Sequence, residues 1–195
     1  MANLILWRHA DAEVESTSGK DCDRALTKKG RKDAVKMAKW LNQHLPANTE
    51  IICSPARRCL ETAAALHDLN GVKIKMAEFL SVDSSVERIA KEVTNADSSK
   101  TILLVGHQPN LGMLIAKLLG LSESTCVVKK GAAWWLRQRH VADAKKRHCK
   151  PICLQCNTQI SNPRKSSCPR KTLKTRNKTN KSINQYSISP IGCHR

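Results

Sequence analysis

The chain of 195 residues has no apolar segment approaching the roughly 20 residues that a membrane-spanning helix needs. Its N-terminus also lacks the positive region, apolar stretch and small-residue cleavage site of a secretory signal. We therefore expect a cytoplasmic protein without a membrane partner. Neither a G-x-G-x-x-G pattern nor a Walker-type loop occurs, which excludes nucleotide binding by those two routes.

Cysteine is present, but its pattern is not that of a disulfide framework. The nine cysteines are an odd number, and Cys53 and Cys59 lie in apolar segments where small core residues are expected. Cytoplasmic proteins also keep their thiols reduced. We therefore expect no disulfide framework.

Acidic and aromatic residues almost disappear from the last part of the chain. Residues 140–195 carry 13 Lys and Arg but one acidic residue, whereas residues 1–139 carry 21 basic and 15 acidic residues. The later segment also has one aromatic residue, Tyr186, and no sustained periodicity. This composition predicts a folded domain at 1–139 and a basic, disordered tail at 140–195.

Three interpretations of the tail remain open. Cys149, Cys153 and Cys156 suggest a zinc knuckle, but a single pair has the usual two-residue spacing. The positive charge favours weak, nonspecific contact with nucleic acid. The abrupt change of composition near residues 139–145 also suggests a shifted reading frame, which would leave residues 132–138 as an unpaired edge strand. An intact frame with a detectable full-length product would count against that hypothesis.

Short apolar runs alternate with segments of helical periodicity up to residue 138. The predicted strands are residues 4–7, 51–53, 72–76, 101–105 and 132–138. Helices are expected after the cap Thr27, after Ser54-Pro55 with Ser54 as cap, at residues 86–93, and at residues 111–118. This alternation predicts an α/β fold with a largely parallel sheet.

Two histidines come at the ends of apolar runs, His9 after Arg8 and His107 after Gly106. The carboxyl ends of parallel strands line the ligand crevice of such sheets, so we expect both histidines in one site. Two further arginines, Arg24 and Arg58, precede or begin predicted helices. Arginine guanidinium groups bind tetrahedral oxyanions through several N–H donors, and a neutral imidazole is a competent nucleophile toward phosphorus. The residues therefore predict a phosphoryl pocket.

Four motifs in order make this sequence similar to the histidine phosphatase superfamily. They are Leu6-Trp7-Arg8-His9-Ala10, with Ala10 where glycine is usual, Leu26-Thr27-x-x-Gly30, Ser54-Pro55-x-x-Arg58-x-x-x-Thr62 and Val105-Gly106-His107-Gln108-Pro109. The resemblance covers about residues 3 to 139. It implies a three-layer α/β/α fold like that of phosphoglycerate mutases, and the short chain resembles the SixA-type branch of phosphohistidine phosphatases.

The resemblance also implies roles for individual residues. His9 would be the phosphorylated nucleophile, and Arg8, Arg58 and His107 would bind the phosphoryl oxygens. Arg24 and Gln108 would be further substrate contacts, Gln108 through its backbone N–H. The implied substrate is a phosphorylated protein such as a histidine phosphotransfer domain, and the alternative is a small phosphomonoester. We expect no cofactor and no metal ion, because the arginines supply the positive charge.

A general acid is the part of the family pattern that this sequence matches least. Glu78 and Asp83 are weak candidates. An alkoxide leaving group needs a proton badly, whereas the nitrogen of a phosphohistidine needs less help. The weak match therefore favours protein phosphohistidine over sugar phosphates, and Glu78 is interpreted as an ordinary loop carboxylate.

Overall fold

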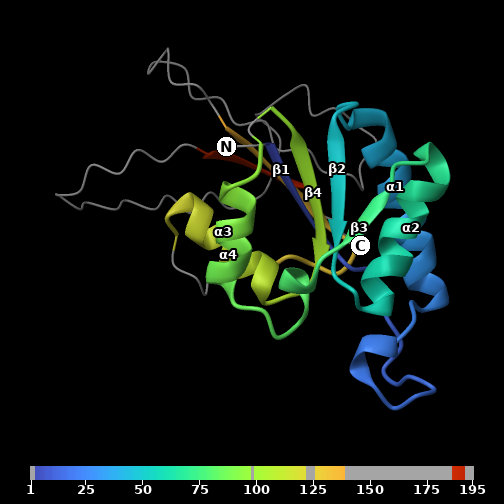
Figure 1. The fold of residues 1–195 in the computed structure, drawn as a ribbon. Coiled ribbons are helices and arrows are strands. Elements are labelled where there is room, and N and C mark those ends of the chain that lie inside the picture. Colours follow the sequence, from blue (N-terminus) through green and yellow to red (C-terminus); the bar gives the residue numbers. More distant parts are fainter. Residues whose placement is uncertain (1–2, 98, 122–125, 139–185, 192–195) are drawn as a thin grey trace, which may run out of the picture.

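The computed structural model describes residues 3–97, 99–121, 126–138 and 186–191. Its centre is a six-stranded sheet in the order β3-β2-β4-β1-β5-β6 (Figure 1). The strands are β1 (Asn3–Arg8), β2 (Thr49–Cys53), β3 (Ile74–Met76), β4 (Thr101–Gly106), β5 (Ala133–Gln138) and β6 (Tyr186–Ile191). The first four are parallel, and β5 runs antiparallel to both β1 and β6. The predicted mostly parallel sheet is confirmed.

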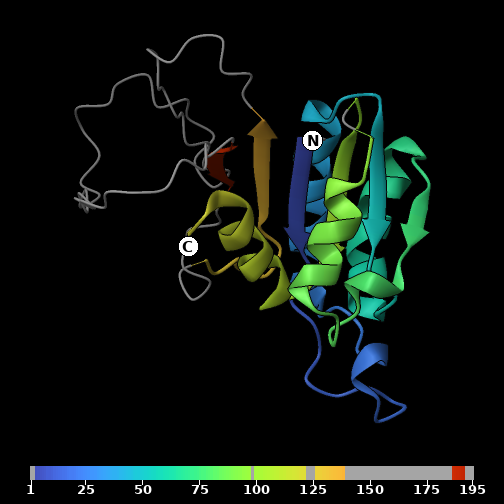
Figure 2. The same ribbon diagram turned by 60° about the vertical axis from the view of Figure 1, so that its left-hand side comes forward.

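Helices cover both faces of this sheet. They are α1 (Lys28–His44), α2 (Arg57–Asn70), α3 (Val86–Thr94) and α4 (Asn110–Leu119), with short 3-10 turns η1 (Asp21–Asp23) and η2 (Glu78–Leu80). Figures 1 and 2 show α1 and α2 on one face and α3 and α4 on the other, which confirms the three-layer α/β/α architecture. None of the helices that the structure describes has both the length and the apolar character to span a membrane.

Burial on both faces explains why the central strands are continuously apolar. In β1, Leu4 and Leu6 belong to the core beneath α3 and α4, whereas Ile5 and Trp7 belong to the core beneath α1 and α2. All four side chains are buried. A one-residue shift would move each apolar pair into the core packed for the other pair, so burial on both faces fixes the position of the residues that follow β1.

The helix ends agree with the sequence in most places. Thr27 caps α1 by accepting a hydrogen bond from the backbone N of Gly30 at 2.8 Å. A Cβ atom on Gly30 would lie 1.9 Å from the carbonyl oxygen of Asp11, so this close approach requires glycine. The predicted cap at Ser54 is wrong, because α2 begins at Arg57 after Ala56 and the Ser54 hydroxyl bonds to His107 instead.

The far edge of the sheet differs from the sequence-based expectation. β6 pairs with β5 along its length, from Ala133 opposite Ile191 to Gln138 opposite Tyr186, so the prediction of an unpaired β5 is wrong. Residues 186–189 alternate apolar residues with serines before Pro190-Ile191, a signal too short to outweigh the composition of the tail. The predicted zinc knuckle and the remainder of 140–195 lie outside the described residues, so the predictions made for them stay predictions.

Candidate active site

The two strand-end histidines lie side by side at the carboxyl edge of the sheet. β1 and β4 are neighbours, with Arg8 in register with Gly106, and the backbone N of His9 donates to the Gly106 carbonyl at 3.1 Å. The imidazole centroids of His9 and His107 are 5.3 Å apart, at an interplanar angle of 57°. Both rings are buried, with 8% and 3% of their surface exposed. Parallel pairing thus brings together residues 98 positions apart.

His9 is held as a neutral ring with a defined tautomer. Its Nδ1 lies 2.8 Å from the Ala10 carbonyl oxygen, which can only accept, so Nδ1 carries the proton and Nε2 keeps its lone pair. Burial lowers the pKa of His9 to about 4, and the positive charges of Arg58, Arg8 and Lys130 add to that shift. Nε2 of His9 is therefore available as a nucleophile at neutral pH.

His107 is fixed by a serine and packed against a cysteine. Ser54 Oγ lies 2.8 Å from His107 Nε2, and Cys59 Sγ lies 3.4 Å from the same atom. Burial lowers the pKa of His107 to about 3, followed in size by the charge of Arg58. Burial also raises the pKa of the Cys59 thiol to about 12, so this cysteine packs as a neutral group. The Ser54 contact was not foreseen, because Ser-Pro is locally the pattern of a helix cap.

Arg8 and Arg58 each donate hydrogen bonds from terminal guanidinium nitrogens, and their Nε atoms differ from these nitrogens. Arg8 Nη1 donates to the Val128 carbonyl at 2.8 Å. Arg58 donates from Nη1 to the carbonyl oxygen of Asp21 at 2.6 Å and from Nη2 to its Oδ2 at 2.8 Å. Within the described residues, the Nε atoms of both arginines are buried without a hydrogen-bond partner. Buried unpaired donors are costly, and two guanidinium groups whose charges both act on His9 suit the binding of an oxyanion.

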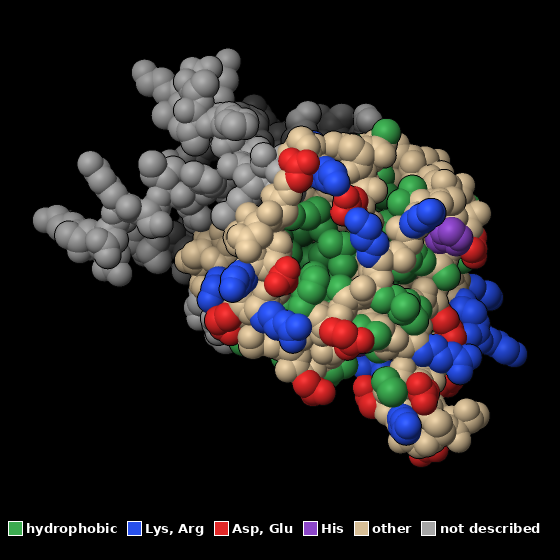
Figure 3. Space-filling view, in the orientation of Figure 1, with side chains coloured by type: hydrophobic (Ala, Val, Ile, Leu, Met, Phe, Trp, Pro, Cys, Tyr) green, Lys and Arg blue, Asp and Glu red, His purple; other side chains and the backbone are tan. Residues whose placement is uncertain are grey.

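Arg24 contacts Oδ1 of the Asp21 carboxylate, whereas Arg58 contacts Oδ2. Its Nε and Nη2 contact Asp21 Oδ1 at 2.8 and 2.6 Å, and its Nη1 donates to the Glu13 carbonyl at 3.0 Å. Residues 13–24 project beyond the strand ends, and this projection exposes acidic and basic side chains together (Figures 1, 2 and 3). Direct contact of Arg24 with a phosphoryl group stays a prediction.

The Gln108 side chain supports the segment that anchors Arg8. Its Nε2 donates to the Cys126 carbonyl at 3.1 Å, and its Oε1 accepts from the Val128 backbone N at 3.3 Å. Gly112 lets this segment approach, because a Cβ there would lie 2.1 Å from the Cys126 oxygen. The predicted phosphoryl contact of Gln108 involves its backbone N–H and stays a prediction.

Thr62 joins the two halves of the site. Its buried Oγ1 accepts from the Ala10 backbone N at 3.0 Å and donates to the Arg58 carbonyl at 2.6 Å. It thus ties the turn after His9 to the first turn of α2. The sequence motif contains Thr62, but only the structure gives it this positioning role.

The candidate general acids lie on the surface. Glu78 is the first residue of η2 and Asp83 lies in the loop before α3, and both are exposed. No interaction within the described part of the chain joins either carboxylate to His9 or His107. In the same part of the chain, no three His, Cys, Asp or Glu side chains gather as a metal site would require.

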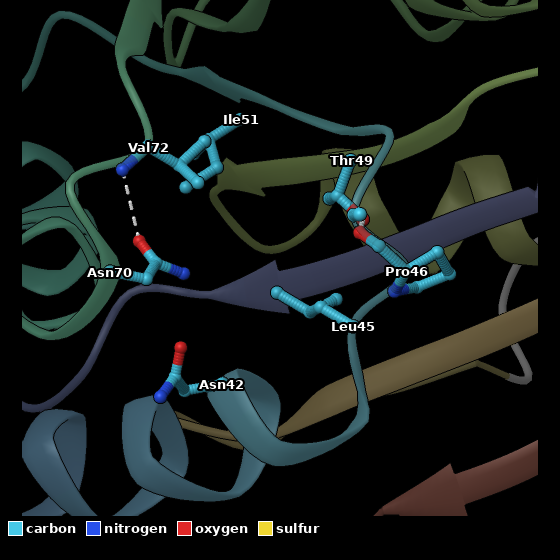
Figure 4. A pocket seen from close by; sticks show the side chains of 8 residues that line it. Asn42, Leu45, Pro46, Thr49, Ile51, Asn70 and Val72 are labelled. Atoms are coloured by element: carbon cyan, nitrogen blue, oxygen red, sulfur yellow. Dashed lines mark hydrogen bonds between the residues drawn. The ribbon is translucent and has the colours of Figure 1, made fainter.

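A cavity of about 190 Å³ opens at the other end of the sheet. It lies between the last turns of α1 and α2 and the start of β2, with Asn42 on one side and Asn70, whose Oδ1 accepts from the Val72 N, on the other (Figure 4). Its lining residues are Asn42, Leu45, Pro46, Ala47, Thr49, Ile51, Asn70 and Val72. None of them is a nucleophile or an acid–base group of the kind that phosphoryl transfer needs, so this cavity is not the catalytic site.

Comparison with known proteins agrees with this geometry. Residues 4–81 match the histidine phosphatase superfamily (branch 1). Over 132 residues the chain is 30% identical to a phosphohistidine phosphatase SixA homolog of Haemophilus influenzae, an overlap that spans 60% of this chain and 77% of that protein. The chain belongs to the histidine phosphatase superfamily.

Solved structures of the superfamily share the fold. One assigned to the phosphohistidine phosphatase SixA of Nakamurella multipartitia is 28% identical, with a TM-score of 0.58, and the match covers 69% of this chain and 83% of that one. The protein histidine phosphatase SixA complexed with tungstate is 20% identical, with a TM-score of 0.62 and coverage of 70% and 88%. A mycobacterial glucosyl-3-phosphoglycerate phosphatase also shares the fold, at 18% identity, a TM-score of 0.55 and coverage of 69% and 89%. This histidine phosphatase superfamily member is thus an enzyme of the phosphatase type, with a SixA-like chain.

Proposed function

We propose that this phosphatase removes the phosphoryl group from protein phosphohistidine through a phosphohistidine intermediate on His9. The observation that carries the proposal is the state of His9, a buried neutral imidazole whose Nδ1–H is fixed on the Ala10 carbonyl. This arrangement leaves Nε2 as the nucleophilic atom. Two arginines with unpaired buried Nε–H groups beside it supply donors for the phosphoryl oxygens.

The reaction would proceed in two displacements. In the first, the lone pair of His9 Nε2 forms a bond to phosphorus as the bond from phosphorus to the substrate imidazole nitrogen breaks, and that nitrogen takes the bonding electrons. In the second, a water oxygen attacks phosphorus, the bond to His9 Nε2 breaks, and inorganic phosphate leaves. The ring is then neutral again, and the proton lost by water goes to phosphate or solvent.

Arg8, Arg58 and His107 would stabilise the charge on the phosphoryl oxygens during both displacements. The dianion itself raises the pKa of a neighbouring imidazole, so a bound phosphoryl group favours a protonated, hydrogen-bonding His107. Gln108 would hold the Arg8 anchor through the segment 126–128. Arg24 is treated separately below.

The leaving group favours phosphohistidine over an alkyl phosphate. Glu78 and Asp83 are exposed and have no contact with the two histidines in the described part of the chain. An imidazole whose other nitrogen is protonated departs as a neutral ring, so it needs less proton donation than an alkoxide. The similarity to a SixA homolog supports the same substrate class. The partner would be a phosphorylated protein, such as a histidine phosphotransfer domain.

The test compares hydrolysis of a phosphohistidine protein, an aryl phosphate and a sugar phosphate by the wild type and His9→Ala. We expect the wild type to hydrolyse phosphohistidine fastest and His9→Ala to be inactive. His67→Ala is the matched control, because His67 is exposed near the end of α2, away from the site. Quenching a single turnover should trap an acid-labile, base-stable phosphoryl group on the wild type. Full activity of His9→Ala would contradict the proposal.

The alternative is a small-molecule phosphomonoesterase of the same superfamily. It is favoured by the shared fold of a glucosyl-3-phosphoglycerate phosphatase, a likeness of fold alone. Faster turnover of sugar or aryl phosphate than of phosphohistidine would establish this alternative and keep the role of His9. Nucleic-acid contact by the tail rests on the charge of residues 140–195 and has no support from the described residues.

A further inference from the structure

We propose that Asp21 is a positioning residue for Arg58 and that Arg24 acts through Asp21 rather than by touching the phosphoryl group. The inference rests on the proposed function, since it concerns the oxyanion site of that reaction. It also replaces the role expected for Arg24 from the sequence.

The first observation is that Asp21 holds Arg58 through two hydrogen bonds. Asp21 accepts one hydrogen bond from each terminal nitrogen of the Arg58 guanidinium, from Nη1 through its carbonyl oxygen and from Nη2 through its carboxylate. Arg58 is only 3% exposed, whereas the Asp21 side chain is 59% exposed. The planar fork is thereby locked in rotation, and three of its five N–H groups, including the buried Nε–H, are not used by Asp21.

The second observation is that the Asp21 carboxylate bridges two guanidinium groups. Oδ2 binds Arg58, and Oδ1 binds Arg24 through Nε and Nη2. Every nitrogen of Arg24 thus has a protein oxygen as partner, counting the Glu13 carbonyl on Nη1. In the described part of the chain, by contrast, Arg8 and Arg58 each keep an unpaired Nε. Arg24 is built as an anchor for Asp21.

Charge supports positioning as well. Arg8, Arg24 and Arg58 carry three positive charges and Asp21 one negative charge, so the group has a net charge of about +2, which matches a phosphoryl dianion. A carboxylate placed only to fill the pocket would compete with that dianion. One placed behind Arg58 would instead hold the arginine at a small electrostatic cost. The two roles predict opposite changes in oxyanion affinity when the carboxylate is removed.

Tungstate affinity, measured by titration calorimetry, separates these roles without requiring turnover. If Asp21 positions Arg58, Asp21→Ala binds tungstate about tenfold to a hundredfold more weakly than the wild type, as loss of a charge-assisted hydrogen bond predicts. Asp21→Asn keeps an acceptor for Nη2 and should recover part of that loss. Tighter binding by Asp21→Ala would overturn the proposal, because it would show that the carboxylate competes with the oxyanion.

The matched control is Asp23→Ala, in the same 3-10 turn. The Asp23 carboxylate accepts hydrogen bonds from Ser18 and Cys22, and within the described residues no hydrogen bond joins it to Arg24 or Arg58. We expect its tungstate affinity to equal that of the wild type. An equal loss in Asp23→Ala and Asp21→Ala would show that any change in this loop has the same effect, which contradicts a specific role for Asp21.

A double-mutant comparison tests the role of Arg24. If Arg24 acts only through Asp21, Arg24→Ala weakens tungstate binding less than Asp21→Ala does, and the double variant behaves like Asp21→Ala alone. Multiplied losses in the double variant would show direct contact of Arg24 with the ligand and overturn that half of the proposal. In turnover, misplacing Arg58 should lower kcat more than it raises KM, because Arg58 serves the developing charge.

Failure of this inference and failure of the proposed function are distinguishable. A protein that binds tungstate with the expected pattern but hydrolyses no phosphohistidine keeps the inference and loses the proposed substrate. A protein with His9-dependent phosphohistidine hydrolysis and unchanged tungstate affinity in Asp21→Ala keeps the function and loses the inference. A wild type that binds no tungstate contradicts the inference.

Discussion

The two ends of the sheet are formed by the same strands and helices but differ in what they bury. At the carboxyl end, two histidines, Arg58, Ser54 and Thr62 are all buried. At the amino end, the polar side chains of the cavity are the exposed amides of Asn42 and Asn70 and the buried Thr49, whose hydroxyl donates to the Pro46 carbonyl. Burying polar groups is costly unless each has a partner, so a dense buried cluster indicates selection for chemistry. The unpaired Nε atoms of Arg8 and Arg58 occur at that end.

The largest expected difference between the two ends concerns charge at the site. Arg58→Ala should lower kcat about a hundredfold to a thousandfold, because a donor to the developing charge is lost. The control is its neighbour Arg57, which is exposed and pairs with Glu61 at 2.7 Å. Arg57→Ala should keep nearly full activity. Equal kcat values for the two variants would remove Arg58 from the site.

The pH dependence of stability should come from the carboxyl end. The pKa values of about 4 for His9 and about 3 for His107 lie below the unfolded value of about 6.5, so the folded state binds fewer protons. Stability is fully present above that unfolded value and is lost as the pH falls. We expect a loss of about 2 kcal/mol per histidine between about pH 7 and pH 5.

Denaturant unfolding at several pH values measures this effect. The acid-induced loss should shrink in His9→Ala and stay unchanged in the control His67→Ala. An unchanged pH profile in His9→Ala would mean that the buried ring is not held neutral.

The hydrogen bonds of Thr62 should matter for stability as well as for activity. Thr62→Val leaves the buried Ala10 N–H without its acceptor and should lower the free energy of unfolding by about 1–3 kcal/mol. Thr94→Val at the exposed end of α3 should cost less than about 0.5 kcal/mol. Chemical denaturation of both variants gives the comparison. Equal stabilities would show that Ala10 N–H finds another partner.

The smallest effect is expected at the amino end. Asn42→Ala and Asn70→Ala should each keep kcat within about twofold of the wild type, because neither amide contacts the site residues. Asn70→Ala also loses the side-chain acceptor of the Val72 N–H, so its cost should appear in stability alone. A large loss of activity in either variant would show that the two ends of the sheet are coupled.

Local patterns predicted the parts of the molecule that depend on local or repetitive signals. The continuous apolar runs before Arg8-His9 and Gly106-His107 indicated buried parallel strands, and parallel strands bring their carboxyl ends to one edge. Thr27 and Gly30 indicated the start of α1 because capping involves residues three apart. The same local logic failed at Ser54, whose partner His107 is 53 residues away.

Contacts between distant segments account for the remaining differences. Asp21 gave no signal in the sequence, because its role depends on Arg58, 37 residues later. The pairing of β6 with β5 was missed since four alternating residues, 186–189, carry little weight inside a strongly basic segment. Both depend on how loops and edges are brought together by the sheet.

By itself, the sequence determined the α/β class, the two strand-end histidines and the resemblance to a phosphatase family, because apolar periodicity and motif spacing are properties of the chain. Only the tertiary structure decided which histidine nitrogen carries the proton, which arginines keep an unpaired donor, and that Arg24 lies behind Asp21. These features depend on burial and on hydrogen bonds between segments far apart in the chain. Such contacts exist only once the sheet has fixed where its loops lie.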